Sequence, residues 1–316
     1  MRNNSPQITV LMPAYNAAKY IGEAIASVLG QSFADFELLI INDGSTDATE
    51  MIIRSFSDER IRLINQTNQG VSAALNMGLM NAEAELIARF DADDICLPGR
   101  LRKQYEFMTA NPGYVLVGTD ATYMDMEGNP VFALEYPAYT DENIRVLPVE
   151  VCPFSHATVM YRKEAVIRCG LYDLNAHSFE DHLLWKQLIR QGKVHNLKEA
   201  LVKVRFSPDS LTIDEKWRGS RFRKLKYEAL RNGFTDKKSG DEIRLILNRQ
   251  DTARIKKGSY YSLLSKKYLF NNYNLARARK SISELIRSNP MHLQGYGLFT
   301  LSLLPERWLK KLYKIR

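Results

Sequence analysis

Short apolar runs alternate with amphipathic stretches through about the first 120 residues of the chain. Five of these runs have the length of a strand and lie at residues 8–12, 38–41, 61–64, 86–90 and 114–117. A strand that is covered by helices on both faces shows such a run, because the side chains on both faces are buried. We therefore predict five buried, parallel strands in this part of the chain.

The segments between these runs carry apolar side chains at helical spacing. In two of them these residues are Ile21, Ala24, Ile25, Val28 and Leu29, then Val71, Ala74, Leu75 and Leu79. A spacing of three and four residues gives each helix one apolar face. Alternating strands and helices predict an α/β fold, a Rossmann-like and mostly parallel sheet flanked by helices.

The pattern loosens after residue 117. We expect a turn at 126–129, helices at 162–169 and 180–190, and strands at 157–161 and 201–206. From about residue 217 the pattern is helical only, and residues 263–285 weakly resemble a helical hairpin. We predict an α/β domain over residues 1–216 and a basic helical region over residues 217–316.

Charge separates the same two regions. Residues 1–216 contain 20 Lys and Arg against 29 Asp and Glu, whereas residues 217–316 contain 24 against 7. An acidic body with a basic C-terminal region suggests different partners for the two. The three cysteines are far apart and suit reduced thiols in cytoplasm rather than disulfides or a zinc site. The sequence shows no secretory leader and no apolar run of membrane-spanning length, so a cytoplasmic location is expected.

Polar residues follow three of the expected strands, at residues 13–16, 42–47 and 91–94. Ligands bind at the carboxyl ends of the strands in open α/β sheets, so these segments form a candidate site. Asp91, Asp93 and Asp94 would repel one another unless something positive neutralises them. Oxygen ligands without His or Cys suit Mg²⁺ or Mn²⁺. A solvated loop or the start of a helix would explain the same residues.

Asp43 follows the apolar run at residues 38–41. A capped loop explains residues 44–47, but an ionised carboxylate at the end of so apolar a strand needs a hydrogen-bond donor. A ribose hydroxyl or a base N–H would supply one.

Three ordered motifs carry a resemblance to a known family. They are "MPAYNAAKYIGEAIASVLGQSFADFELLIINDGSTD", "NQGVSAALNMGLMNAEAELIARFDADDICLPGRLRKQ" and "FEDHLLWKQLIRQG". Residues 7–207 resemble a bacterial polysaccharide-type, family 2 inverting glycosyltransferase of the GT-A fold. The resemblance implies transfer of a sugar from a nucleoside diphosphate, with UDP favoured, to a hydroxyl of a glycan or lipid-linked acceptor, using Mn²⁺ or Mg²⁺.

By position, the resemblance assigns donor binding to Pro13, Ala14, Tyr15, Asp43, Asn68, Asp91 and Asp93. Within this set Asp93, with Asp91, would hold the metal at the diphosphate. Asp94 is better explained as a cap of the following turn. The family often places His where this chain has Ser207, which leaves the third protein ligand of the metal open. Arg100 could assist phosphate binding, or form a surface ion pair.

The resemblance makes Asp181 the general base that takes the proton of the acceptor hydroxyl, within hydrogen-bond reach. Glu180 would orient the acceptor. His156 would contact the acceptor, or pack and hydrogen-bond ahead of a strand. Two acids that open a helix also stabilise its dipole without any catalytic role.

The C-terminal segment places Trp308, Leu309, Leu312 and Ile315 on one expected helical face, surrounded by Lys and Arg. This pattern is typical of an interfacial helix on anionic lipid, which would make the protein peripheral at the inner face of the plasma membrane. A helix packed on its own domain explains it equally well. A non-catalytic sugar-nucleotide-binding protein is the main alternative function. A nucleic-acid-binding protein is a weaker one, because no nucleic-acid motif accompanies the basic region.

Overall fold

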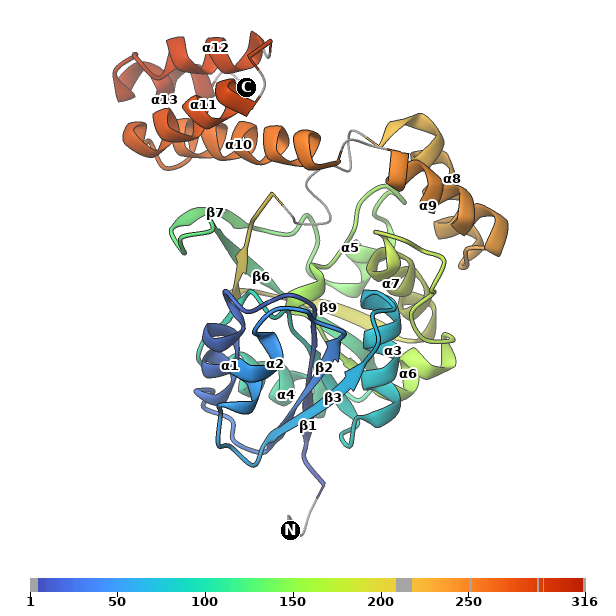
Figure 1. Cartoon of the computed structure of the whole chain (residues 1–316). Coiled ribbons are helices and arrows are strands. Elements are labelled where there is room, and N and C mark those ends of the chain that lie inside the picture. The colour runs from blue at the N-terminus through green and yellow to red at the C-terminus, as the bar shows by residue number, and fades with distance from the viewer. Residues whose placement is uncertain (1–4, 209–217, 250–251, 289, 292, 315–316) are drawn as a thin grey trace. The chain divides into compact units, whose positions relative to one another are not determined.

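The computed structural model describes residues 5–208, 218–249, 252–288, 290–291 and 293–314 of the chain (Figure 1). The chain forms two compact units. The first comprises Met1–Ala121, Leu134–Val204 and Lys224–Asp241, and the second Thr122–Ala133, Arg205–Arg223 and Glu242–Arg316. The units interleave along the chain, and the division into domains 1–216 and 217–316 stays a prediction.

A nine-stranded sheet runs in the order β3-β2-β1-β4-β8-β6-β9-β5, with β7 paired to β6 (Figure 1). The strands are β1 (Ile8–Ala14), β2 (Phe36–Asp43), β3 (Ile61–Gln66), β4 (Leu86–Arg89), β5 (Ile95–Cys96), β6 (Tyr114–Met124), β7 (Pro130–Leu134), β8 (Met160–Arg162) and β9 (Lys193–Arg205).

The strands that sequence periodicity indicated most clearly form the parallel part of this sheet. β1 pairs in parallel with both β2 and β4, and β2 pairs in parallel with β3. The short strand β8 pairs antiparallel with both β4 and β6. Because β8 runs opposite to both neighbours, β4 and β6 run in the same direction. The mostly parallel sheet is therefore confirmed, with an antiparallel strand inserted in it.

Helices precede and follow these strands along the chain. They are α1 (Ile21–Leu29), α2 (Thr49–Arg54), α3 (Val71–Asn81), α4 (Arg100–Ala110), α5 (Asp141–Arg145), α6 (Lys163–Arg168), α7 (Glu180–Gln191), α8 (Gly219–Asn232), α9 (Lys237–Arg249), α10 (Thr252–Phe270), α11 (Leu275–Ser288), α12 (Leu293–Leu301) and α13 (Glu306–Lys314), with a 3₁₀ turn η1 (His156–Thr158). The strand expected at residues 157–161 is thus wrong in its first half, because η1 precedes β8.

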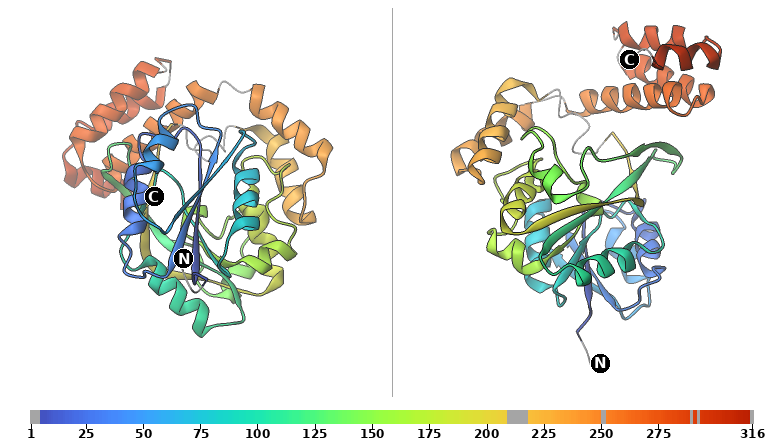
Figure 2. Two further views of the ribbon diagram at one scale, coloured as in Figure 1. Left: turned by 60° about the horizontal axis from the view of Figure 1, so that its bottom comes forward. Right: turned by 180° about the vertical axis from the view of Figure 1, so that it is seen from behind.

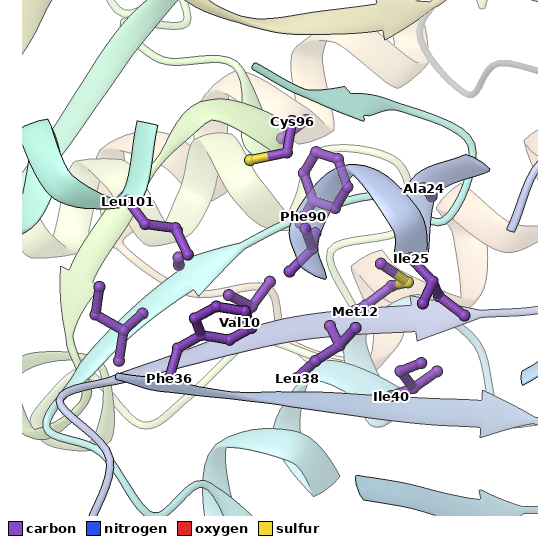
Figure 3. Packing of buried hydrophobic residues seen from close by; sticks show 14 of the residues in the cluster. Val10, Met12, Ala24, Ile25, Phe36, Leu38, Ile40, Phe90, Cys96 and Leu101 are labelled. Carbon is purple, nitrogen blue, oxygen red and sulfur yellow. The ribbon is translucent and has the colours of Figure 1, made fainter. Parts of the chain in front are cut away.

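Alternating side chains of the central strands bury two opposite faces of the sheet. Val10 and Leu38 pack with apolar residues of α1 and α4 (Figure 3), and Ile53 of α2 belongs to the same cluster. Their neighbours Leu11 and Leu39 point the other way and pack with residues of α3, α6 and α7. This double burial explains why the strands read as continuous apolar runs.

The second unit has a helical core of its own, whose members α10 to α13 are orange and red in Figure 2. Tyr260 and Leu264 of α10 and Ile282 of α11 are buried in one cluster, which confirms the helical hairpin. Asp125, in the β6–β7 connection, accepts hydrogen bonds from the Tyr268 hydroxyl at 2.7 Å and from Arg277 at 3.2 Å. These polar contacts join the connection to both helices of the hairpin.

The predicted apolar face of the last helix is only partly present in α13. Leu309 is fully buried in the helical core, whereas Trp308 is 51% exposed, so the two side chains do not share a face. The side chains of Leu312 and Ile315 lie outside the described residues. Within the described part of the chain, no helix combines the length and apolar character that crossing a membrane requires.

Truncation of a core side chain tests the two-faced sheet. We expect Leu38→Ala to lower the free energy of unfolding by about 2–5 kcal/mol, because it leaves a cavity between β2 and α1. Met51→Ala is the control, since Met51 is 69% exposed and its truncation removes little buried surface. Urea denaturation of both variants measures the difference, and equal midpoints would contradict the packing described.

Candidate active site

The loops that follow β1 and β2 are fastened to each other by hydrogen bonds. The amide of Asn16 donates to Ser45 Oγ at 3.0 Å, and its Oδ1 accepts from the amide of Thr46 at 2.8 Å. Asn16 adopts a φ of 48°, a left-handed conformation that asparagine tolerates better than most residues. The preceding segment is thereby fixed, with Ala14 buried, Pro13 half-buried and Tyr15 exposed to solvent.

Asp43 ends β2 as a buried carboxylate whose donors come from the chain itself. It accepts hydrogen bonds from Gln66 Nε2 at 2.6 Å and from the amides of Gln69 and Gly70, both at 2.9 Å. A nucleoside is therefore not needed to satisfy this carboxylate. Its demonstrated contacts instead hold the loop of residues 66–70, on which Asn68 is exposed.

Gly44 allows this loop to approach so closely. Its φ is 72°, and a Cβ at this position would lie 2.7 Å from the amide nitrogen of Asn68. A larger residue would push against backbone rather than against a side chain that can turn away. The sequence "NDG" thus places a carboxylate and a tight turn side by side.

The aspartates that follow β4 meet a cation supplied by the chain. Arg89, the last residue of β4, is buried and forms an ion pair with Asp91. Burial by itself lowers the pKa of Arg89, but the charge and hydrogen bond of Asp91 reverse this and raise it overall. The sequence interpretation missed Arg89, although a charged residue inside an apolar strand is a signal that it has a buried partner.

Asp94 and Arg100 are buried and have contacts within the protein. Asp94 is 2% exposed and interacts electrostatically with Arg89 and with Arg100. Arg100 is fully buried and donates from Nη2 to the carbonyl oxygens of Arg89 at 2.8 Å and Val159 at 3.2 Å. Both alternatives that the sequence suggested for Arg100, a phosphate contact and a surface ion pair, are therefore wrong.

Asp91 and Asp93 remain as candidate metal ligands, both partly accessible. Among the described residues, no group of three His, Cys, Asp or Glu side chains could hold a metal ion. Mg²⁺ is commonly bound by one or two carboxylates together with substrate phosphates. The carboxylate oxygens of Asp91 and Asp93 fit such an ion when substrate phosphates complete its coordination shell.

The start of α7 brings two more acids to this end of the sheet. Glu180 is buried, and Asp181 Oδ1 accepts the amide of His182 at 2.6 Å. Burial and then the charge of Asp181 raise the pKa of Glu180 to about 7. The charge of Asp91 also raises this pKa, whereas the charge of Arg89 lowers it. Residues 90 positions apart in sequence therefore share one electrostatic environment, as the motif assignment requires.

His156 belongs to a buried aromatic group beside these acids. Its Nε2 lies 2.9 Å from the Tyr172 hydroxyl, which lies 3.3 Å from the Tyr161 hydroxyl, and its ring packs edge-on against Trp185. Burial and the charge of Arg89 hold the pKa of His156 well below its usual range, so the imidazole is neutral. The sequence motifs assigned no role to Tyr161 or Tyr172.

Arg205 and Ser207 belong to the second unit. Arg205 is buried and donates from Nη1 to the carbonyl oxygen of Met126 at 3.2 Å.

Comparison with known families gives a match over half of the chain. The model of the family described as "Glycosyl transferase family 2" matches residues 9–170. A putative glycosyltransferase, EpsE of Bacillus subtilis, is 35% identical over 66% of this chain and 76% of its own length. The O-antigen biosynthesis glycosyltransferase WbnJ of Escherichia coli is 32% identical over 63% of this chain and 79% of its own length. The chain spans only about half, 52%, of an uncharacterised Rickettsia conorii glycosyltransferase that is 28% identical.

Solved structures share the fold at low sequence identity. Staphylococcus aureus TarS in complex with UDP-GlcNAc has a TM-score of 0.58 and 17% identity, covering 98% of this chain and 91% of that one. The mannosyltransferase PcManGT of Pyrobaculum calidifontis, in complex with GDP-Man and Mn²⁺, has a TM-score of 0.55 and 16% identity. It covers 98% of this chain and 89% of that one.

The raised pKa of Glu180 predicts a specific dependence of stability on pH. Unfolded, this carboxyl ionises near 4.5, and folded near 7, so the native state holds the extra proton between these values. Stability that is fully present below pH 4.5 is therefore lost as pH rises through about 7, by about 3 kcal/mol. Glu180→Gln removes this loss, because glutamine carries no charge.

Urea denaturation at several pH values, in EDTA, measures the effect. The free energy of unfolding of Glu180→Gln should fall less between about pH 5 and pH 8 than that of the wild type. Glu164→Gln, at a side chain 77% exposed, is the matched control and should follow the wild type. Parallel curves for all three proteins would refute the buried acid.

Proposed function

Because the chain belongs to glycosyl transferase family 2, we propose that it transfers a sugar from a nucleoside-diphosphate donor, with inversion, to an acceptor hydroxyl. One observation carries this proposal: Asp91 after β4, held by its ion pair with Arg89, lies close enough to Glu180 at the start of α7 for their charges to interact. A site for displacement at a sugar needs both groups, one beside the departing diphosphate and one beside the attacking hydroxyl.

Donor binding falls to the loops at the carboxyl ends of β1, β2 and β3. Pro13, Ala14 and Tyr15 would line the nucleoside pocket, and the exposed Tyr15 offers a ring for stacking. Asp43 would act chiefly by holding the 66–70 loop in place, which presents Asn68 to the nucleotide. UDP is the favoured nucleotide, an assignment supported by the UDP and UDP-GlcNAc complexes of TarS.

Asp91 and Asp93 would hold a divalent ion, Mn²⁺ or Mg²⁺. When bound, such an ion neutralises the diphosphate and makes it a better leaving group. The protein's own contribution is to fix Asp91 through its ion pair with Arg89. That ion pair also limits the net negative charge that a diphosphate meets on entering.

Asp181 is proposed as the base and Glu180 as the group that orients the acceptor. Asp181 takes the proton of the acceptor hydroxyl, whose oxygen forms a bond to the anomeric carbon as the bond to the diphosphate oxygen breaks. The bonding electrons leave with the nucleoside diphosphate. Glu180, whose pKa is raised to about 7 by burial and by Asp181, holds a proton more readily than an exposed carboxyl and can donate a hydrogen bond.

The acceptor is proposed to be a glycan or lipid-linked sugar in cell-surface polysaccharide synthesis. The name of WbnJ as an O-antigen biosynthesis enzyme supports this acceptor class. Such an acceptor would place the enzyme in the cytoplasm, peripheral to the inner face of the plasma membrane. His156 would support the acceptor side through Tyr172 rather than by proton transfer, since its lowered pKa makes the imidazole a weak base.

Replacement of Asp93 tests the donor side. Asp93→Ala should weaken binding of UDP in the presence of Mn²⁺ by about tenfold or more, because the metal loses a carboxylate ligand. Calorimetric titration with and without Mn²⁺ measures this change. Asp35→Ala, at an exposed aspartate, is the control. Equal metal-dependent affinity in both variants would remove Asp93 from the metal site.

Replacement of Asp181 tests the base and separates an enzyme from a non-catalytic sugar-nucleotide-binding protein. Asp181→Asn should bind donor and metal as the wild type does, while turnover of UDP-sugars falls by about 100-fold or more, because the amide cannot accept a proton. Donor calorimetry and release of UDP are measured on one preparation. Retained turnover in Asp181→Asn with loss in Glu180→Gln would move the base to Glu180. A wild-type protein that binds UDP-sugars without turnover would support the binding protein.

A further inference from the structure

An uncharged segment in the second unit exposes large apolar side chains. Between Arg287 and Glu306 the sequence contains no Asp, Glu, Lys or Arg over 18 residues. Helix α12 lies inside this segment and buries Gly295 and Leu298 against the helical core. Leu293, on another side of the same helix, is 83% exposed.

The exposed residues form one stripe. Leu293, Tyr296, Phe299 and Leu303 recur every three or four residues, so they lie along one side of α12 and of the turn that follows it; we call them the α12 stripe. Their exposed fractions are 83%, 47%, 46% and 61% respectively. Apolar side chains scattered singly on a surface are normal, but a contiguous stripe marks a surface that contacts a partner.

Basic residues flank the stripe in the sequence. Residues 275–316 contain nine Lys and Arg against two Glu. In α13, Arg307, Lys310 and Lys311 are exposed, and the ammonium of Lys311 lies 5.5 Å from the centre of the exposed Trp308 ring. A partner that matches this surface therefore has an apolar part for the stripe and negative charge for the basic residues.

We propose that the α12 stripe inserts into the headgroup region of an anionic lipid membrane and attaches the protein there reversibly. Tyr and Trp are favoured at this depth, and neighbouring Lys and Arg bind the anionic headgroups. A second copy of the chain is a poorer partner, because a two-fold contact of identical surfaces would bring the same positive charges together. The stripe differs from the α13 face expected from the sequence, since Leu309 of that face is buried.

Vesicle co-sedimentation with the full-length protein tests the proposal. The wild type should sediment with vesicles of phosphatidylcholine and phosphatidylglycerol at low salt, and not with phosphatidylcholine alone. The variant Leu293→Ser/Phe299→Ser/Leu303→Ser should bind about tenfold more weakly or worse, because it removes most of the apolar surface. Arg307→Glu/Lys311→Glu should lose the dependence on anionic lipid.

Two control variants match these changes elsewhere on the chain. Met51→Ser/Met80→Ser alters exposed apolar side chains of the first unit, and Lys237→Glu/Lys238→Glu reverses two exposed charges at the start of α9. Both should sediment as the wild type does. Circular dichroism and thermal melting establish that each variant is folded, and Leu293→Ser alone replaces the triple variant if that one is not.

Two results would overturn the proposal. One is a wild-type protein that stays in solution with anionic vesicles at low salt. The other is sedimentation unchanged by the serine substitutions. Analytical ultracentrifugation identifies the rival occupant: an oligomer of the wild type that the serine variant dissociates, without vesicle binding, would assign the stripe to a second copy.

Discussion

The ion pair between the buried Arg89 and the partly accessible Asp91 is the interaction on which the candidate site depends. Asp91, Asp94 and Glu180 gather near the carboxyl end of β4, and Arg89 and Arg100 are the cations beside them. A buried arginine without a carboxylate would cost several kcal/mol, and the buried carboxylate of Asp94 likewise needs a cation nearby. Because each side needs the other, the site keeps its shape before any metal or diphosphate arrives.

The parallel part of the fold could be predicted from sequence because its signal is local. Strands covered on both faces read as apolar runs, and β1 to β4 lie where those runs do. A strand was expected at residues 157–161, but its antiparallel insertion had no such signal. The residues that β8 pairs with in β4 and β6 lie more than 40 positions earlier in the chain.

The positions of the acids were predicted for a similar reason, and their partners were not. A strand end fixes where Asp43 and Asp91 lie, so their residue types were informative. What binds them depends on tertiary contacts. Asp43 accepts hydrogen bonds from the 66–70 loop and Asp91 pairs with Arg89, and neither contact was predicted from the sequence. The hydrogen bonds of the buried Tyr161 and Tyr172 likewise depend on tertiary contacts.

The separation of charge along the chain affects how the protein meets a charged surface, and this effect does not depend on how the two units are arranged. Residues 1–216 are net negative and residues 217–316 net positive, so an anionic surface repels the part with the site and attracts the other. Both effects fade beyond a Debye length of about 10 Å at 0.1 M salt, so they act only near the surface. A nucleoside diphosphate carries negative charge of its own, so neutralisation by Arg89 and a divalent ion matters most at the carboxyl end of β4.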